Sequence, residues 1–136
     1  MTLGGAYATR NYTIKHLQDL KGKTVLTETM PFTPSEAVAA EEAGIDTLKV
    51  KFDPDNPASA IAIRKAAPHT FMTFCIGLTK IATEAEAVRA GYDAMDLGAD
   101  GIMCQWGPEF IRAVSRVGIP VEAHAGLVPR LSTWTG

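Results

Sequence analysis

The chain has 136 residues, of which 46% are hydrophobic and 21% charged, and its net charge is −2. This length and composition fit one globular domain with a single core, and exclude a disordered or fibrous chain. Acidic and basic residues are interleaved without a basic stripe, which argues against nucleic acid as a partner. No apolar run is long enough to cross a bilayer, and residues 1–11 lack the apolar stretch of a signal peptide, so we expect neither membrane attachment nor secretion.

The chain alternates short apolar runs with stretches rich in Ala, Glu, Arg and Leu, which predicts strands alternating with helices. An N-terminal arm, 1–22, contains a predicted helix over 13–20 that could plug the bottom of a barrel. The predicted strands that follow are 24–30, 47–52, 71–76, 101–105 and 120–124. Residues 23–124 thus form five strand–helix units, residues 125–136 a final loop, and residues 1–136 a single domain.

The predicted helices carry clear start and stop signals. Thr33 precedes Pro34 and stands three residues before Glu36, which is a capping box with proline at the first helical position. Thr83 and Glu86 repeat the capping box. Two further helix starts combine a cap with a proline, at Asn56-Pro57 and Gly107-Pro108. Three glycines are expected to end helices: Gly44, Gly98 and Gly118.

Successive predicted strands start about 19 to 30 residues apart, which fits parallel strands joined by helices. We expect an α/β fold made of parallel (β/α) units, equal to about the first five strands of a TIM (β/α)₈ barrel and incomplete in this chain. Length alone would also fit a doubly wound open sheet, but no strand is followed by a glycine-rich phosphate loop. A closed barrel needs about 250 residues, so the missing strands would follow Gly136 or come from another chain. Open edges favour self-association, and we expect a homo-oligomer.

In a parallel barrel, chemistry lies at the carboxyl ends of the strands. In the second strand Lys49, Lys51 and Asp53 alternate with apolar residues, so these charged side chains should share the inner face. They could supply a cation for a carboxylate or keto substrate beside an acidic metal ligand. They could equally be the solvated charges of an edge or mouth strand, and both interpretations stay open.

In the fifth strand Glu122 and His124 lie two residues apart and therefore on one face, before a glycine-containing loop. A carboxylate beside an imidazole can bind an anion, orient a metal-bound water or transfer protons, although a lone histidine is more often structural. We interpret His16 and His69 as structural. Trp106 and Trp134 follow strands, where they could wall a pocket or form an oligomer interface.

Both cysteines, Cys75 and Cys104, fall inside predicted strands. Cysteine there behaves as a small buried hydrophobe, and free thiols suit a reducing compartment. No spacing of Cys or His resembles a zinc site, so we expect both residues in the core. We therefore expect a cytoplasmic protein that acts on a small molecule.

The strand-five segment, residues 118–129, resembles the I-P-V-x-x-H-x-G-L-x-P segment of the ketopantoate hydroxymethyltransferase family, within the phosphoenolpyruvate mutase/isocitrate lyase superfamily. Further landmarks follow the family's order. They are Thr27-Glu28-Thr29, Glu42-Ala43-Gly44-Ile45, the helix entry 82–87 and Gly98-Ala99-Asp100. The resemblance starts at about Thr13 and covers only the first half of the family's length.

This resemblance implies a cytosolic, homo-oligomeric, Mg²⁺-dependent TIM-barrel enzyme of pantothenate biosynthesis. Such an enzyme transfers a hydroxymethyl group from the co-substrate 5,10-methylenetetrahydrofolate to a small 2-oxo acid, 3-methyl-2-oxobutanoate. The metal chelates the keto acid and acidifies its carbon-bound hydrogen.

The resemblance also implies site residues. His124 aligns with the substrate-binding histidine, and we add Asp53, Lys51 and Glu122 as substrate-binding candidates. The metal positions fall at Asp53, if one residue is inserted, at Gln105 and at Cys75, which is not a ligand that Mg²⁺ prefers. The family's general base falls beyond Gly136, so no catalytic residue is assigned.

Two alternatives follow from the replaced carboxylates. The chain could belong to another 2-oxo-acid carbon–carbon bond lyase or mutase of the superfamily, with Lys49 or Lys51 replacing a lost strand-four cation. It could also be a non-catalytic oligomeric paralogue.

Overall fold

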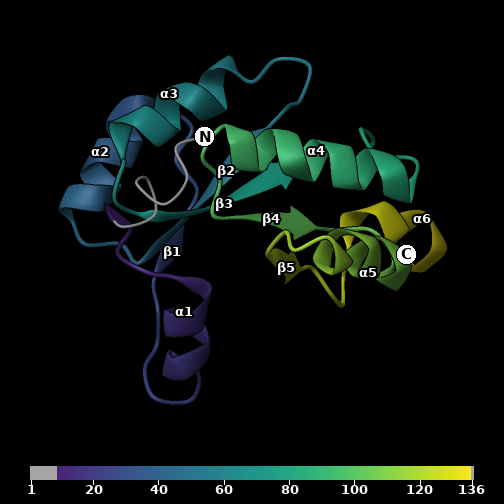
Figure 1. Cartoon of the computed structure of the whole chain (residues 1–136), viewed down its shortest axis with the longest axis horizontal. Helices are drawn as coiled ribbons and strands as arrows, with labels where there is room; N and C mark the ends of the chain where they lie inside the picture. The colour runs from purple at the N-terminus through teal and green to yellow at the C-terminus, as the bar shows by residue number, and fades with distance from the viewer. Residues whose placement is uncertain (1–8, 136) are drawn as a thin grey trace.

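A computed structural model of the chain describes residues 9–135. Residues 1–8 and Gly136 lie outside the described residues. Much of the expectation about a signal peptide, and part of the expected N-terminal arm, falls on residues 1–8. Parallel pairing joins five strands into one sheet in the order β1-β2-β3-β4-β5 (Figure 1). The strands are β1 (Glu28–Thr29), β2 (Thr47–Phe52), β3 (Phe71–Ile76), β4 (Gly101–Cys104) and β5 (Val121–Ala123). The predicted α/β class with parallel (β/α) units is therefore confirmed.

Helices alternate with these strands. They are α1 (Ile14–Leu20), α2 (Pro34–Glu42), α3 (Ala58–Ala66), α4 (Glu84–Asp96), α5 (Pro108–Arg116) and α6 (Ser132–Thr135), with a 3₁₀ helix η2 (Pro129–Leu131) before α6. Residues 129–135 are thus helical where the sequence predicts a loop, and Pro129 starts η2 because proline fits the first turn of a helix. Within the described part of the chain, no helix is long and apolar enough to cross a membrane.

The predicted caps are confirmed at most helix ends. Thr33 and Thr83 accept hydrogen bonds from the backbone of Glu36 and Glu86, and both capping boxes close. Asn56 is not a cap, because Pro57 occupies the N-cap position of α3 and no side chain caps that helix. The glycines that end helices take φ values of 77°, 97° and 86° at Gly44, Gly98 and Gly118.

The first strand is shorter than the predicted 24–30. Strand β2 begins only at Thr47, which pairs with Glu28, so the residues before Glu28 run past the end of their neighbour. Thr27 is held by Asp46, whose Oδ2 accepts from the Thr27 backbone N–H at 2.7 Å and from its hydroxyl at 2.8 Å. The Thr27 carbonyl oxygen also accepts from the Thr47 backbone N–H at 3.1 Å, so one side chain and one backbone hydrogen bond fix this residue.

The core lies between the outer face of the sheet and the helices. Leu48, Val50 and Phe52 are buried to 1% exposure or less, and they cluster with residues of α2, α3, α4 and α5, as predicted for the apolar side of β2. The opposite face of the sheet carries Lys49 and Lys51 and is not covered by these helices.

The sheet bends around its uncovered face. In a flat sheet β2 and β5 would stand roughly 14 Å apart, since neighbouring strands are about 4.8 Å apart. The Nζ atom of Lys49 on β2 nevertheless lies 2.7 Å from a carboxylate oxygen of Glu122 on β5. These side chains can meet across two intervening strands only because the sheet curves like part of a barrel wall.

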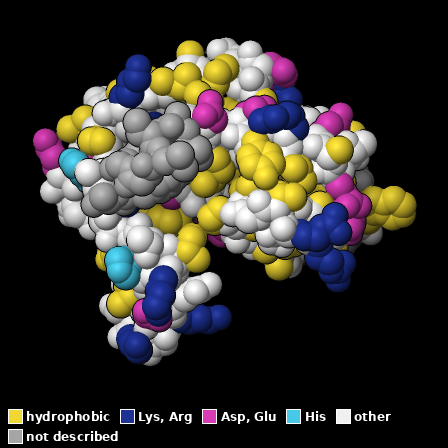
Figure 2. Space-filling view, viewed as in Figure 1, with side chains coloured by type: hydrophobic (Ala, Val, Ile, Leu, Met, Phe, Trp, Pro, Cys, Tyr) yellow, Lys and Arg dark blue, Asp and Glu magenta, His cyan; other side chains and the backbone are white. Residues whose placement is uncertain are grey.

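Helix α1 projects from the body of the molecule (Figure 1), and none of its residues is buried. On the face that Figure 2 shows, basic and acidic side chains are scattered among apolar ones and form no continuous basic stripe.

Candidate functional site

The inner face of the sheet, the side turned away from α2–α5, carries most of the polar side chains that the strands contribute. Its residues follow from the alternation along each strand and from the pairing register. From β1 to β5 they include Glu28, Lys49, Lys51, Thr73, Cys75, Met103 and Glu122, with Gln105 and His124 next in the same alternation. The predicted charged face of β2 therefore exists.

Lys49 lies at the centre of this face between two carboxylates. Its Nζ atom is 2.7 Å from an oxygen of Glu28 and 2.7 Å from an oxygen of Glu122. Burial alone would lower the pKa of Lys49, but hydrogen bonds and the charges of Glu122 and Glu28 outweigh that effect and raise it above its ordinary value. Lys49 therefore stays protonated across the physiological range.

Lys51 lies two residues nearer the carboxyl end of β2 and is exposed. Among the described residues it makes no ion pair, and its charge contributes to lowering the pKa of Asp53. The pKa of Asp53 is lowered chiefly by the Asp55 backbone N–H, and then by Lys80, whose Nζ lies 3.2 Å from Asp53 Oδ1. Lys51 is thus a cation of the inner face that remains available to a ligand.

The residues at the three expected metal positions do not offer the donors that Mg²⁺ prefers. Burial raises the pKa of Cys75 to about 12, so its thiol stays neutral. The amide nitrogen of Gln105 donates to the carbonyl oxygen of Ile76 at 3.1 Å, and Asp53 is paired with Lys80. Among residues 9–135 no group of three or more His, Cys, Asp and Glu side chains could hold a metal ion. We derive no step through a metal, and Mg²⁺ binding stays a prediction.

His124 continues the ladder beyond β5, because its backbone N–H donates to the Cys104 carbonyl oxygen at 2.9 Å. Its Nδ1 atom is buried and has no hydrogen-bond partner among the described residues. Buried polar atoms are usually paired, so this nitrogen is a candidate for contact with a ligand. Within the described chain no hydrogen bond or ion pair joins His124 to Asp53, although both are predicted to bind substrate.

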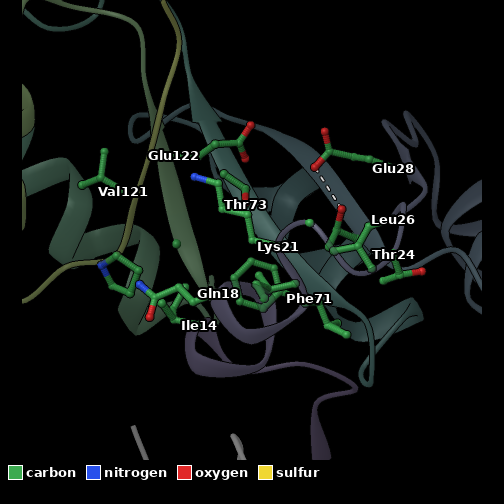
Figure 3. Close-up of a pocket in the computed structure, with 16 residues that line it drawn as sticks. Ile14, Gln18, Lys21, Thr24, Leu26, Glu28, Phe71, Thr73, Val121 and Glu122 are labelled. Atoms are coloured by element: carbon green, nitrogen blue, oxygen red, sulfur yellow. Dashed lines mark hydrogen bonds between the residues drawn. The ribbon is translucent and has the colours of Figure 1, made fainter.

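A hollow of about 660 Å³ lies below these residues, at the amino ends of the strands. Figure 3 shows Phe71 and the side chains of Ile14 and Gln18 on its lower wall, with Glu28 and Glu122 at its upper end. Helix α1 lines this hollow rather than plugging it. The sequence did not predict the hollow, because its walls come from five separate strands and α1.

The remaining candidates have structural positions. Trp106 is buried, its ring centroid lies 6.0 Å from that of Phe110, and its Nε1–H donates to the Leu78 carbonyl oxygen at 3.2 Å. It belongs to the hydrophobic core. Trp134 is 87% exposed. His16 closes the capping box of α1.

The other expected structural residues also lie where a scaffold needs them. A ring nitrogen of His69 lies 3.1 Å from the Thr9 carbonyl oxygen. Cys75 and Cys104 are both buried, as predicted.

The fold and the inner face define a class: a partial (β/α)-barrel of the kind that enzymes use. No family model matches the chain. Two curated relatives, however, are each named 3-methyl-2-oxobutanoate hydroxymethyltransferase. The one from Kosmotoga olearia is 27% identical over 137 residues, covering 86% of this chain and 51% of the relative. The one from Pyrococcus furiosus is 27% identical over 144 residues, covering 89% and 50%.

The chain therefore spans about half the length of the curated relatives it matches, and it has a partial relationship to that family. Among solved structures, a Toxoplasma gondii protein described as a deoxyribose-phosphate aldolase has a TM-score of 0.51 and 14% identity, covering 87% of this chain and 59% of that one. This likeness concerns the fold alone.

Proposed function

We propose that the inner face, at the carboxyl ends of the strands, binds the carboxylate of a small 2-oxo acid. We further propose that it does so as part of an enzyme that transfers a hydroxymethyl group from 5,10-methylenetetrahydrofolate to 3-methyl-2-oxobutanoate, in pantothenate biosynthesis. The names of the two curated relatives support this reaction, and the similarity to each of them covers more than four-fifths of this chain.

One observation carries the proposal: Lys51 faces inward without an ion pair among the described residues. The pairing register places Lys51, Cys75, Met103 and Glu122 in one cross-strand row, and His124 follows Glu122 one inward position nearer the mouth. An ammonium group at this end of the sheet suits a substrate carboxylate. The unpartnered Nδ1 of His124 suits a hydrogen bond to the keto oxygen or the carboxylate.

In this proposal the described residues bind and orient the 2-oxo acid. The general base that removes its carbon-bound proton is not among them. Lys51 would hold the carboxylate, and a donor on His124 would stabilise negative charge that develops on the keto oxygen as the carbon-bound proton leaves. The resemblance places the group that removes this proton beyond Gly136, so no proton transfer is assigned to the described chain.

The test is calorimetric titration of the chain with 3-methyl-2-oxobutanoate. We expect Lys51→Met to weaken binding by about tenfold or more, because a charge partner of the ligand is removed. Lys65→Met, an exposed lysine on α3, should leave the affinity unchanged. Absence of binding by the unmodified chain at millimolar ligand would contradict the proposal.

Cys75 and Gln105 favour a second candidate, a paralogue that binds a 2-oxo acid without catalysis. Neither side chain offers a charged oxygen where the resemblance places a metal ligand. Exchange of the substrate's C3 proton in ²H₂O, measured on the full polypeptide, separates the candidates: binding with exchange supports the enzyme, and binding without exchange supports the paralogue. If the chain instead serves another 2-oxo-acid lyase or mutase, Lys51 rather than the doubly paired Lys49 is the cation available to it.

A further inference from the structure

Lys49 joins the first and last strands of the sheet. Glu28 belongs to β1, Lys49 to β2 and Glu122 to β5, and both carboxylates lie 2.7 Å from the one ammonium group. Strand β5 is not a sheet neighbour of β1 or β2. This trio, Lys49 with Glu28 and Glu122, is therefore a side-chain bridge across the concave face, and we call it the clasp.

The two carboxylates of the clasp differ in what else they bind. Glu28 uses one oxygen for Lys49, and its other oxygen accepts from the Thr47 hydroxyl at 3.0 Å. Glu122 uses one oxygen for Lys49, and its second oxygen has no hydrogen-bond partner among the described residues. Glu28 thus anchors the lysine, while Glu122 keeps an oxygen for another group.

The ammonium group of Lys49 is already paired with two carboxylates, so it is not free to bind a substrate anion. The titratable and charged groups that face it are Glu28, Glu122, the thiol of Cys75 and Lys51, and Lys21 extends from the arm into the hollow below (Figure 3). With two carboxylates already on its ammonium, Lys49 would have to break an ion pair before it could bind an incoming anion. Among the described residues Lys51 has no such partner.

We propose that Lys49 is a positioning residue that fixes Glu122 beneath His124 and sets the distance between β1 and β5. Through this role it keeps the carboxylate of Glu122 and the ring of His124 in one arrangement at the proposed substrate site. The effect of the clasp on substrate rests on the proposed function, whereas its effect on the shape of the sheet does not. Two experiments test these parts separately.

The first experiment measures the sheet directly. Spin labels on Thr29→Cys in β1 and Ala123→Cys in β5 report the distance between the two strands by pulsed electron resonance; both positions are exposed, and the native cysteines are buried. We expect one narrow distance distribution with Lys49 present, a broader one in Lys49→Met, and a narrow one again in Lys49→Arg, whose guanidinium can bridge two carboxylates. The exposed Lys65→Met serves as the control. An unchanged distribution in Lys49→Met would overturn the clasp, whatever the chain binds.

The second experiment measures 3-methyl-2-oxobutanoate affinity in a double-mutant cycle. Glu28→Gln should weaken binding severalfold in the unmodified background, because it loosens Lys49, and should have no further effect in Lys49→Met. Lys49→Arg should restore most of the affinity that Lys49→Met loses. Additive effects of Glu28→Gln and Lys49→Met would overturn the positioning role. If the unmodified chain binds no 2-oxo acid, the proposed function fails, and the spin-label result still decides the clasp.

Discussion

Asp100 directly precedes β4, and its side chain accepts hydrogen bonds from three residues that are distant in sequence. Its carboxylate binds Arg10 Nε at 2.9 Å, Arg64 Nη1 at 3.2 Å and the Met72 backbone N–H at 2.8 Å. Its side chain is 4% exposed, and those of both arginines are 8% exposed. Burial and the charge of Arg10 lower the pKa of Arg64 to about 10, and the charge of Asp100 opposes that shift. Asp100 thus compensates two guanidinium groups that burial disfavours.

We expect Asp100→Asn to lower the free energy of unfolding by about 3–5 kcal/mol, because it leaves buried cations uncompensated. The measurement is urea unfolding followed by circular dichroism. Asp19→Asn, which breaks an exposed ion pair with Lys15 on α1, should change stability by less than about 1 kcal/mol and serves as the control. Equal losses of unfolding free energy in the two variants would show that Asp100 stabilises the fold no more than an exposed ion pair does.

Cys75 makes the stability of the molecule fall at high pH. Its pKa is raised from 9.0 to about 12 by burial, so above pH 9 the unfolded chain releases the thiol proton while the folded chain retains it. Stability associated with this group is therefore fully present below pH 9 and is lost as the pH rises towards 12. We expect the unfolding free energy of the unmodified chain to fall more steeply between these limits than that of Cys75→Ala. Parallel slopes, measured by urea unfolding, would mean that the folded thiol titrates normally.

At the scale of the elements, helix starts make a paired prediction possible. Thr83 caps α4 and Glu86 accepts from the backbone N–H groups of Ala82 and Thr83 at 2.8 and 2.9 Å, whereas Asn56 caps nothing. We expect Thr83→Ala to cost about 1 kcal/mol of unfolding free energy and Asn56→Ala to be nearly neutral. Thermal unfolding of the two variants checks this. A larger loss of unfolding free energy for Asn56→Ala than for Thr83→Ala would show that Asn56 caps α3, as the sequence predicted.

The elements that the sequence predicted well are those fixed by local signals. Capping threonines, terminal glycines and alternation in β2 act within a few residues, and the structure has β2 and β3 with the predicted bounds. The length of β1 depends on where its neighbour begins, at Thr47, and no signal within residues 24–30 carries that information.

The site was less predictable, because its arrangement depends on contacts between distant parts of the chain. Alternation placed Lys49 and Lys51 on the inner face, but nothing in the sequence distinguished the paired lysine from the unpaired one. Their difference arises when curvature brings Glu122 to Lys49. Lys80 likewise meets Asp53 and Asp55 from the loop after β3, a pairing that only the fold creates.

For the whole molecule, the open edges of the sheet matter most. Among residues 9–135, β1 pairs only with β2 and β5 only with β4, so within the described chain each has one unpaired side. Beyond β5, Leu127 is 91% and Trp134 is 87% exposed. Unpaired edges and exposed apolar side chains favour association with further strands, from another copy or from other residues. Formation of a homo-oligomer stays a prediction, and substitutions at Leu127 and Trp134 can test it.

We expect the 136-residue chain to self-associate in the micromolar range, as measured by sedimentation equilibrium. Replacing Leu127 and Trp134 together by Ser should weaken association by about tenfold or more, because exposed apolar area at the edge is removed. Tyr92→Ser on α4, which packs on α5 rather than at an edge, is the matched control. A chain that stays monomeric throughout would show that short edges suffice to prevent pairing. Association that survives the double substitution would place the contact on the other edge, at β1.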